Sequence, residues 1–245
     1  MRRFFVEPGT VQGRQVSLGQ ELVHRLARVL RMRPGEQFVL FDGSGREWVM
    51  ELKDVSRRSA LATVVGHAEP PPEPQVSVVL YMCLIKEPRF ELVLEKATEL
   101  GVGAIVPVVA KRSVVRPWKE GGAKQERWWR LVVEATEQCG RARPPDLLAP
   151  IPFAQAVRQA RGLRLLPWER EAQQGLREAL RRWEGDRRQV SVLIGPEGGL
   201  EVEEVEMAQE AGFQVVSMGR RILRAETAAL AALAVIMYET GELGP

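Results

Sequence analysis

The feature of this sequence that most limits its fold is a regular succession of apolar and amphipathic segments after residue 75. The apolar segments are rich in Val, Ile and Leu, as parallel strands buried on both faces are. They cover residues 76–85, 104–109, 163–166, 190–194 and 213–217. Segments with helical spacing of apolar residues alternate with them, at 88–100, 126–140, 170–183, 202–211 and 226–238. This alternation predicts an α/β domain whose parallel sheet is covered by helices on both faces.

A proline-rich segment separates that region from one with a different pattern. Residues 69–75, EPPPEPQ, are polar and favour polyproline II, so we place a linker there between domains at 1–68 and 76–245. Before the linker, three segments have the alternation of strands: 36–41, 46–53 and 60–65. An amphipathic helix with several arginines is expected at 20–31. The first domain is therefore predicted to be a small β-barrel with one basic helix.

The composition excludes several classes of protein. With 245 residues, of which 45% are hydrophobic, the chain can bury a sizeable core and is not disordered throughout. Two cysteines without CxxC spacing and two histidines make a disulfide framework or a zinc site unexpected. The longest late apolar run, 228–238, is about half of the ~20 residues needed to span a bilayer, so we expect a soluble, cytoplasmic protein with no membrane partner.

Charge is concentrated at one end of the chain. The net charge of +3 is too small to identify a polyanionic partner by itself. Residues 1–68 hold eleven basic and seven acidic residues, so the excess of positive charge lies in the first domain. A role for this domain in binding phosphates would fit that distribution.

The first motif that could carry chemistry is LIGPEGGL at residues 193–200, where a buried strand runs into a glycine-rich loop. Open α/β sheets bind their ligands at the carboxyl ends of parallel strands, and glycines allow a ligand to approach the backbone. The loop is not a phosphate loop, because no Lys, Ser or Thr follows the glycines, and it lacks the GxGxxG spacing of dinucleotide sites. On spacing alone, it is either a tight strand-to-helix turn or a ligand-binding loop.

The second motif is MGRRILRAETAA at residues 218–229, between a strand and an Ala-rich helix. Glu226 and Thr227 could simply stabilise the start of that helix. Arg224 stands one step before the helix, where its guanidinium could face the same cleft as the glycine-rich loop.

Together, the two motifs resemble the signature of the bacterial 16S ribosomal RNA uridine N3-methyltransferase family, a branch of the SPOUT methyltransferases. KATELG at 96–101 and EATEQCGR at 134–141 are similar to the family as well. The family usually has Thr where this chain has Ala225 and Ser where it has Cys139, both of which are small-for-small changes. The resemblance implies a PUA-like RNA-binding first domain. It also implies a SPOUT methyltransferase domain with a parallel sheet and a deep trefoil knot.

The resemblance also implies that S-adenosylmethionine is bound by three loops, around 167–169, 194–199 and 217–228. The cofactor-binding residues implied in this way are Leu166, Pro167, Trp168, Ile194, Gly195, Pro196, Glu197, Gly198, Gly199, Ser217, Met218, Gly219, Ile222, Leu223, Arg224, Thr227 and Ala228. Apolar side chains among them would form the walls that a purine and a methylthio group prefer. The resemblance further implies a homodimer formed through the knotted region, and methyl transfer from a sulfonium needs no metal.

The imide nitrogen of uracil is a poor nucleophile until its proton leaves, so the site must stabilise an anion and assist deprotonation. We expect Arg224 to stabilise the anion and consider Glu99 and Glu137 as candidate bases. The partner is expected to be 16S rRNA or the small ribosomal subunit. Arginines of both domains could form a phosphate track for it: Arg3, Arg25, Arg28, Arg31, Arg112 and Arg141.

Two alternatives from other classes remain open at this point. A non-catalytic RNA-binding ribosome assembly factor would explain the basic first domain, but it would leave the glycine-rich loop and the Arg224 segment without a purpose. A nucleotide-dependent enzyme with an ordinary doubly wound sheet is disfavoured by the missing phosphate motifs.

Overall fold

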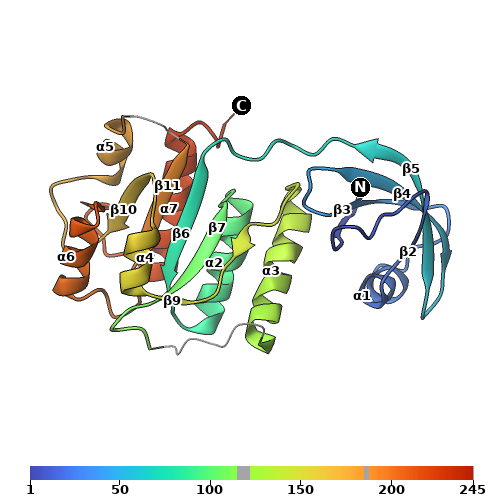
Figure 1. Cartoon of the computed structure of the whole chain (residues 1–245), viewed down its shortest axis with the longest axis horizontal. Coiled ribbons are helices and arrows are strands. Elements are labelled where there is room, and N and C mark those ends of the chain that lie inside the picture. The colour runs from blue at the N-terminus through green and yellow to red at the C-terminus, as the bar shows by residue number, and fades with distance from the viewer. Residues whose placement is uncertain (115–121, 185–187, 245) are drawn as a thin grey trace. The chain divides into compact units, whose positions relative to one another are not determined.

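The computed structural model describes residues 1–114, 122–184 and 188–244 and divides the chain into two compact units (Figure 1). Unit 1 consists of Met1–Glu73 together with Thr136–Pro144. Unit 2 consists of Pro74–Ala135 and Pro145–Pro245. One division falls inside the proline-rich segment, whereas the return of residues 136–144 to unit 1 had no signal in the sequence.

Unit 1 is built on a five-stranded sheet with the order β1-β3-β4-β5-β2. Its strands are β1 (Arg3–Phe5), β2 (Gln15–Ser17), β3 (Gln37–Phe41), β4 (Glu47–Val55) and β5 (Ala60–Ala68). β1 runs parallel to β3, and the other pairs are antiparallel. The predicted small β domain is thus confirmed. The short edge strands β1 and β2 were not predicted, and no pairing between them closes the sheet within the described residues.

The predicted basic helix of unit 1 is present and changes its hydrogen-bonding pattern midway. It begins as α1 (Gln20–His24) and continues as a π-helical turn (Arg25–Val29), in which the Leu30 amide donates to the Arg25 carbonyl at 2.9 Å. Leu22, Val23 and Leu26 of this segment are buried against the sheet residues Phe38, Leu40, Met50 and Leu52. The wider turn ends at Arg31, which has a positive φ of 50°. The helix therefore buries one apolar side and leaves Arg28 exposed, whereas Arg25 is half-buried.

Unit 2 contains a sheet of seven strands in which every pairing is parallel. The strand order is β12-β10-β11-β6-β7-β8, and β9 also pairs with β7. The strands are β6 (Ser77–Cys83), β7 (Ala104–Val109), β8 (Asp146–Leu147), β9 (Ile151–Pro152), β10 (Leu163–Pro167), β11 (Gln189–Ile194) and β12 (Gln214–Val216). All five predicted strands are present, and the fold class is confirmed.

Helices cover both faces of this sheet, as predicted (Figure 1). They are α2 (Glu87–Glu99), α3 (Ala123–Cys139), α4 (Phe153–Gln159), α5 (Leu176–Arg181), α6 (Val202–Glu210) and α7 (Ala225–Glu239). α2, α3, α5 and α7 share one core cluster with the sheet, whereas α4 and α6 share the other. The trefoil knot stays a prediction. In the part of the chain that the structure describes, no helix has the length and apolar character needed to cross a membrane.

The helix predicted at 170–183 is shorter than expected, and the reason lies in its hydrogen bonds. α5 spans only Leu176–Arg181. Before it, the Ser217 amide donates to the Gln174 carbonyl at 2.7 Å and the Leu176 amide donates to the Ser217 carbonyl at 3.0 Å. These bonds and the bridge between Gly175 and Ser217 hold the chain beside the end of β12, so the helix begins only at Leu176. The sequence also gave no signal for the short helix α4.

Gly162, immediately before β10, allows a close approach to β11 that no other residue could make. Its φ is +68°, and a Cβ there would lie 2.0 Å from the carbonyl oxygen of Gln189. We expect Gly162→Ala to lower the free energy of unfolding by about 2–4 kcal/mol, because the two strands would have to separate. Gly175→Ala is the control, since nothing lies within 4 Å of its Cβ position; it should cost at most about 1 kcal/mol as a helix cap. Urea denaturation measures the stability of both variants. Equal urea midpoints for Gly162→Ala and Gly175→Ala would contradict the close approach inferred at Gly162.

Candidate active site

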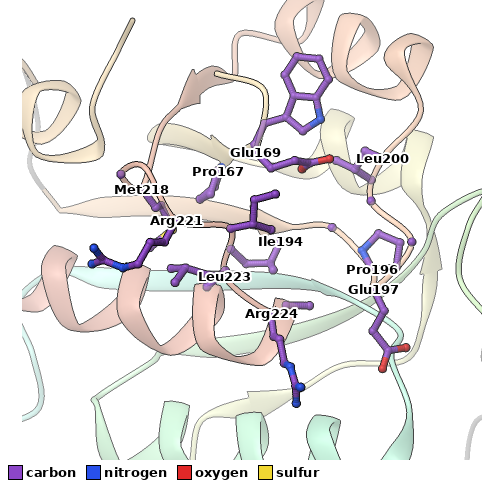
Figure 2. A pocket seen from close by; sticks show the side chains of 18 of the residues that line it. Pro167, Glu169, Ile194, Pro196, Glu197, Leu200, Met218, Arg221, Leu223 and Arg224 are labelled. Atoms are coloured by element: carbon purple, nitrogen blue, oxygen red, sulfur yellow. The ribbon is translucent and has the colours of Figure 1, made fainter. Parts of the chain in front are cut away.

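Loops that follow three neighbouring strands of unit 2 enclose a pocket of about 470 Å³. β12, β10 and β11 are adjacent in the sheet, so their carboxyl ends meet at one edge. Figure 2 shows Pro167, Ile194 and Leu223 gathered in the middle of the pocket, while Glu197 and Arg224 extend from the same side of it. The volume lies within the range of about 300–1,000 Å³ that is usual for small-molecule sites.

The wall of the pocket is apolar where the strands end. Ile194 and Leu200 are buried, and Pro167, Met218 and Leu223 are half-buried. Charged side chains line the rest of the pocket, namely Arg89, Glu169, Glu197, Arg220, Arg221 and Arg224. An apolar wall with a charged rim can take a flat, partly polar molecule and orient its charged groups.

The glycine-rich loop between β11 and α6 needs its glycines for space as well as for conformation. A Cβ on Gly195 would lie 3.0 Å from Cγ of Leu200, and one on Gly198 would lie 3.2 Å from Cβ of Arg112. Gly199 has a φ of +72°, a conformation that L side chains rarely adopt. The loop is therefore a compact turn whose backbone lines the pocket.

The loop after β7 holds the glycine-rich loop from outside. Arg112 donates to Oε1 of Glu201 at 2.8 Å and to the carbonyl of Gly198 at 3.0 Å. The buried carboxylate of Glu204 accepts hydrogen bonds from the amides of Lys111, at 2.9 Å, and Glu201, at 3.0 Å. Arg112, predicted as an RNA contact, thus supports one wall of the pocket.

The loops after β10 and β12 are joined to each other by backbone hydrogen bonds. The Trp168 amide donates to the Val216 carbonyl at 3.0 Å, in addition to the Ser217 bonds described above. Further along, the Gln173 and Gln174 amides donate to the Glu171 carboxylate and lower its pKa below the ordinary value. Backbone hydrogen bonds therefore hold two of the three pocket loops together.

The structure brings most of the predicted cofactor-binding residues together. Pocket-lining residues from the predicted set are Pro167, Trp168, Ile194, Gly195, Pro196, Glu197, Gly198, Gly199, Met218, Gly219, Ile222, Leu223, Arg224 and Ala228. The other three do not line it: Leu166 is buried in the core, Ser217 is held by its backbone bonds, and Thr227 is an exposed residue of α7. The cofactor role of the whole set stays a prediction.

Arg89 was missing from the predicted site. It lies in the first turn of α2, directly after β6, and its side chain lines the pocket. Its Nη1 lies 2.7 Å from Oε1 of Glu197. The sequence places Arg89 at the carboxyl end of a strand, but only the strand order, with β6 beside β11, brings it next to the glycine-rich loop.

Neither predicted base is among the residues that line the pocket. Glu99 is exposed on α2 and accepts a hydrogen bond from Lys96 at 2.8 Å. Glu137 belongs to unit 1, where its side chain is 7% exposed. Its Oε1 accepts bonds from the Phe5 amide at 2.9 Å and from Arg25 Nη1 at 3.0 Å. Their placement gives no support to a role in proton transfer.

Three of the predicted RNA-binding arginines have partners inside unit 1. Arg25 pairs with Glu137 and lies 4.9 Å from the ring centroid of Phe4. Arg3 pairs with Glu47 and lies 4.8 Å from the Phe41 ring centroid, and Arg141 pairs with Glu73 at 2.6 Å. Burial raises the pKa of Glu47, and the neighbouring Arg3 opposes that shift. An RNA phosphate would have to compete with these carboxylates.

Arg28 and Arg31 have a different environment. Both are exposed and line a hollow on unit 1 whose other polar side chains are Ser56 and Arg57. Three guanidinium groups around one hollow form a concentrated positive charge on the surface.

Comparison with known proteins defines the class. Residues 71–237 match the model of the RNA methyltransferase domain, and residues 19–65 match that of the RNA methyltransferase PUA domain. The chain is therefore an RNA methyltransferase family member with a PUA domain, which confirms the fold class predicted from the motifs.

Individual relatives narrow the family. The ribosomal RNA small subunit methyltransferase E of Synechocystis is 37% identical over 96% of this chain and 76% of that protein. That of Bacillus subtilis is 32% identical over 98% and 97% of the two chains. The chain belongs to the ribosomal RNA small subunit methyltransferase E family.

Solved structures of similar proteins contain the cofactor. The Neisseria gonorrhoeae member, crystallised with S-adenosyl methionine, has a TM-score of 0.87 and 33% identity, with 97% of each chain covered. A methyltransferase from Legionella pneumophila, also with bound cofactor, has a TM-score of 0.87 and 33% identity over 96% of each chain.

The environment of Glu137 predicts a structural rather than a catalytic effect. Glu137→Ala leaves Arg25 and the Phe5 amide without their acceptor, so we expect the free energy of unfolding to fall by about 2–4 kcal/mol. Glu99→Ala, which removes an exposed carboxylate, should change it by less than about 0.5 kcal/mol. Urea denaturation measures both values. A stable Glu137→Ala protein that has lost methyl transfer would instead show that Glu137 acts in catalysis.

Proposed function

We propose that this protein transfers a methyl group from S-adenosylmethionine to N3 of a uridine in 16S ribosomal RNA. The observation that carries the proposal is the pocket formed by the loops after β10, β11 and β12. It occurs in a chain whose similarly folded relatives were crystallised with this cofactor. The uridine N3 position comes from the family resemblance of the LIGPEGGL and RAETA motifs.

The residues present fit S-adenosylmethionine. Ile194, Met218 and Leu223 offer an apolar surface to the adenine and the methylthio group. Nε1 of Trp168 is buried and has no acceptor among the described residues, so a donor remains unsatisfied at the pocket. Glu169 can face the positive sulfonium, while arginines of the rim can pair with the carboxylate of the methionine part. When bound, the cofactor supplies an electrophilic methyl group.

Arg224 is suited to the charge that develops on the acceptor. It is the residue before α7, it is exposed at the pocket, and within the described residues it has no carboxylate partner. As N3 loses its proton, negative charge spreads onto the uracil carbonyl oxygens. A guanidinium beside them would stabilise this charge and lower the barrier. The apolar wall would hold the base in line and exclude water from the reacting atoms.

Unit 1 is proposed to hold the RNA outside the pocket. The hollow lined by Arg28, Arg31 and Arg57 offers phosphate contacts, and none of these arginines pairs with a carboxylate in the part of the chain that the structure describes. Arg3, Arg25 and Arg141 are expected to contribute less, because each already pairs with a glutamate. Phosphate contacts of this kind position an RNA without reading its sequence.

We further propose that the protein forms a homodimer through the methyltransferase domain and acts in the cytoplasm. Ile222 and Tyr238, at the pocket loop and on α7, are large apolar residues that are exposed in the single chain and would gain from being covered. The alternative of a non-catalytic RNA-binding factor leaves the pocket unexplained, and the named relatives are methyltransferases.

Purified protein should add one methyl group, at N3 of a uridine, to small subunits or 16S rRNA from a strain that lacks the enzyme. Mass spectrometry of nuclease fragments detects the product, and absence of any transfer would overturn the proposed function.

Arg224→Ala should lower kcat by about 10²-fold or more, because the anion loses its cation. Affinity for S-adenosylhomocysteine, measured by calorimetry, should stay within severalfold. Arg177→Gln, which removes only the surface pair with Glu239, is the matched control. Unchanged turnover in Arg224→Ala would remove the role of this residue.

The hollow of unit 1 predicts a salt-dependent contribution to RNA binding. The double variant Arg28→Gln, Arg31→Gln should weaken rRNA binding and reduce the slope of log Kd against log salt by about 1–2, since one counterion or so is released per phosphate contact. Arg14→Gln, which removes an exposed arginine that does not line the hollow, should leave the slope unchanged. Filter binding at several salt concentrations measures it, and parallel slopes for all three proteins would refute this assignment.

A further inference from the structure

Two carboxylates, one from the glycine-rich loop and one from the start of α7, share one guanidinium at the rim of the pocket. Nη1 of Arg89, from α2, lies 2.7 Å from Oε1 of Glu197 in the glycine-rich loop. Nε of the same arginine lies 3.7 Å from Oε1 of Glu226, in the first turn of α7. The arginine therefore connects the loop after β11 to the start of α7. Neither catalytic role considered from the sequence uses this group of side chains.

Glu226 fixes the position of Arg89. Its side chain is 10% exposed, and its Oε2 is buried without a hydrogen-bond partner among the described residues. A carboxylate that is so poorly solvated strongly favours a nearby positive charge. Arg89 supplies that charge, and its backbone belongs to α2, whose residues Phe90, Val93 and Leu94 are fully buried. The guanidinium is thus anchored from two directions.

The anchored arginine determines what Glu197 and Arg224 can do. Figure 2 shows the side chains of both residues extending from the same side of the pocket. If Arg89 were absent, the carboxylate of Glu197 would lose the cation that holds it through Oε1. With Arg89 present, Glu197 is held through Oε1, its Oε2 makes no hydrogen bond within the described residues, and Arg224 remains without a carboxylate partner. A basic oxygen and a cation therefore both line the same pocket.

We propose that Glu197 accepts the N3 proton of the target uridine and that Arg89 is the positioning residue that holds it for this task; the proposal rests on the proposed function above. The N3–H bond breaks and its proton passes to Oε2 of Glu197, while the negative charge moves to the uracil oxygens beside Arg224. The bond from N3 to the methyl carbon forms as the carbon–sulfur bond breaks. The products are 3-methyluridine, S-adenosylhomocysteine and a proton, which Glu197 releases to water.

This assignment suits the difficulty of the step. A carboxylate alone is a weak base for a uracil imide, so proton transfer has to accompany methyl transfer and the stabilisation of the anion. The side chain of Glu197 is 21% exposed, so an incoming base can reach it and its proton can return to solvent. Glu169 also lines the pocket, but it lies on the loop after β10, where Figure 2 shows it on the opposite side of the pocket from Arg224.

The test compares two RNA substrates. Glu197→Gln should lower the rate of N3 methylation of 16S rRNA by about 10²-fold or more, while calorimetric affinity for S-adenosylhomocysteine stays within about threefold. With 16S rRNA transcribed from 5-fluorouridine triphosphate, whose N3 proton is more acidic, the defect should shrink by at least about tenfold, because less help from a base is needed. Raising the pH should also narrow the difference between variant and wild-type protein.

Arg89 is tested through its effect on Glu197. Arg89→Gln should reduce kcat by about tenfold with KM for RNA nearly unchanged, and Arg89→Lys should restore most of the loss. Adding Arg89→Gln to Glu197→Gln should cost little more, since a positioning residue has nothing left to position. Arg127→Gln, which removes the pair between α3 and Glu91 on α2, is the matched control and should leave all rates unchanged.

Three results would overturn the proposal. If wild-type protein methylates uridine N3 and Glu197→Gln does so equally well, the proton acceptor lies elsewhere and the proposed function stands. An equal defect on uridine and 5-fluorouridine RNA would show that Glu197 does not handle the proton. A loss of S-adenosylhomocysteine affinity as large as the loss of rate would make Glu197 a cofactor-binding residue only.

Discussion

The parallel pairing of β10 with both β11 and β12 is the interaction on which the site depends. It brings three carboxyl ends to one edge of the sheet, although the strands are separated along the chain by α5 and α6. Gly162 allows β10 to approach β11 closely where the two strands begin. After β12, backbone hydrogen bonds of Ser217 join its loop to the loop after β10. The pocket is therefore a property of backbone geometry first, and side chains then give it chemical character.

The arginines of this chain divide into two groups according to whether an acid faces them. Arg3, Arg25 and Arg141 are paired within unit 1 and hold together segments that are distant in the sequence. Arg28 and Arg224 stand at hollows without such a partner among the described residues. The sequence alone does not separate these groups. Arginine suits both environments, a structural ion pair beside an aromatic ring and an exposed surface that can bind phosphate.

Much of the fold could be predicted because buried parallel strands and amphipathic helices leave strong periodic signals. All five main strands of unit 2 follow from that pattern, whereas the loops that line the pocket were implied by the family resemblance of two glycine- and arginine-containing motifs. What could not be predicted depends on pairing across long distances. Arg89 joins the site only because β6 lies beside β11, and Glu137 leaves it because its turn of α3 belongs to unit 1. α5 begins only at Leu176 because Gln174 and Leu176 bond to Ser217.

The assignment of residues 136–144 to unit 1 limits how this protein can be divided. The chain leaves unit 1 at Glu73, returns within α3 and leaves again after Pro144. A fragment that stopped at the proline-rich segment would lack the Glu137 carboxylate, which accepts hydrogen bonds from Arg25 and the Phe5 amide. Unit 1 is therefore not a detachable fragment, and its exchange between homologues would require both of its segments, Met1–Glu73 and Thr136–Pro144, to be replaced together.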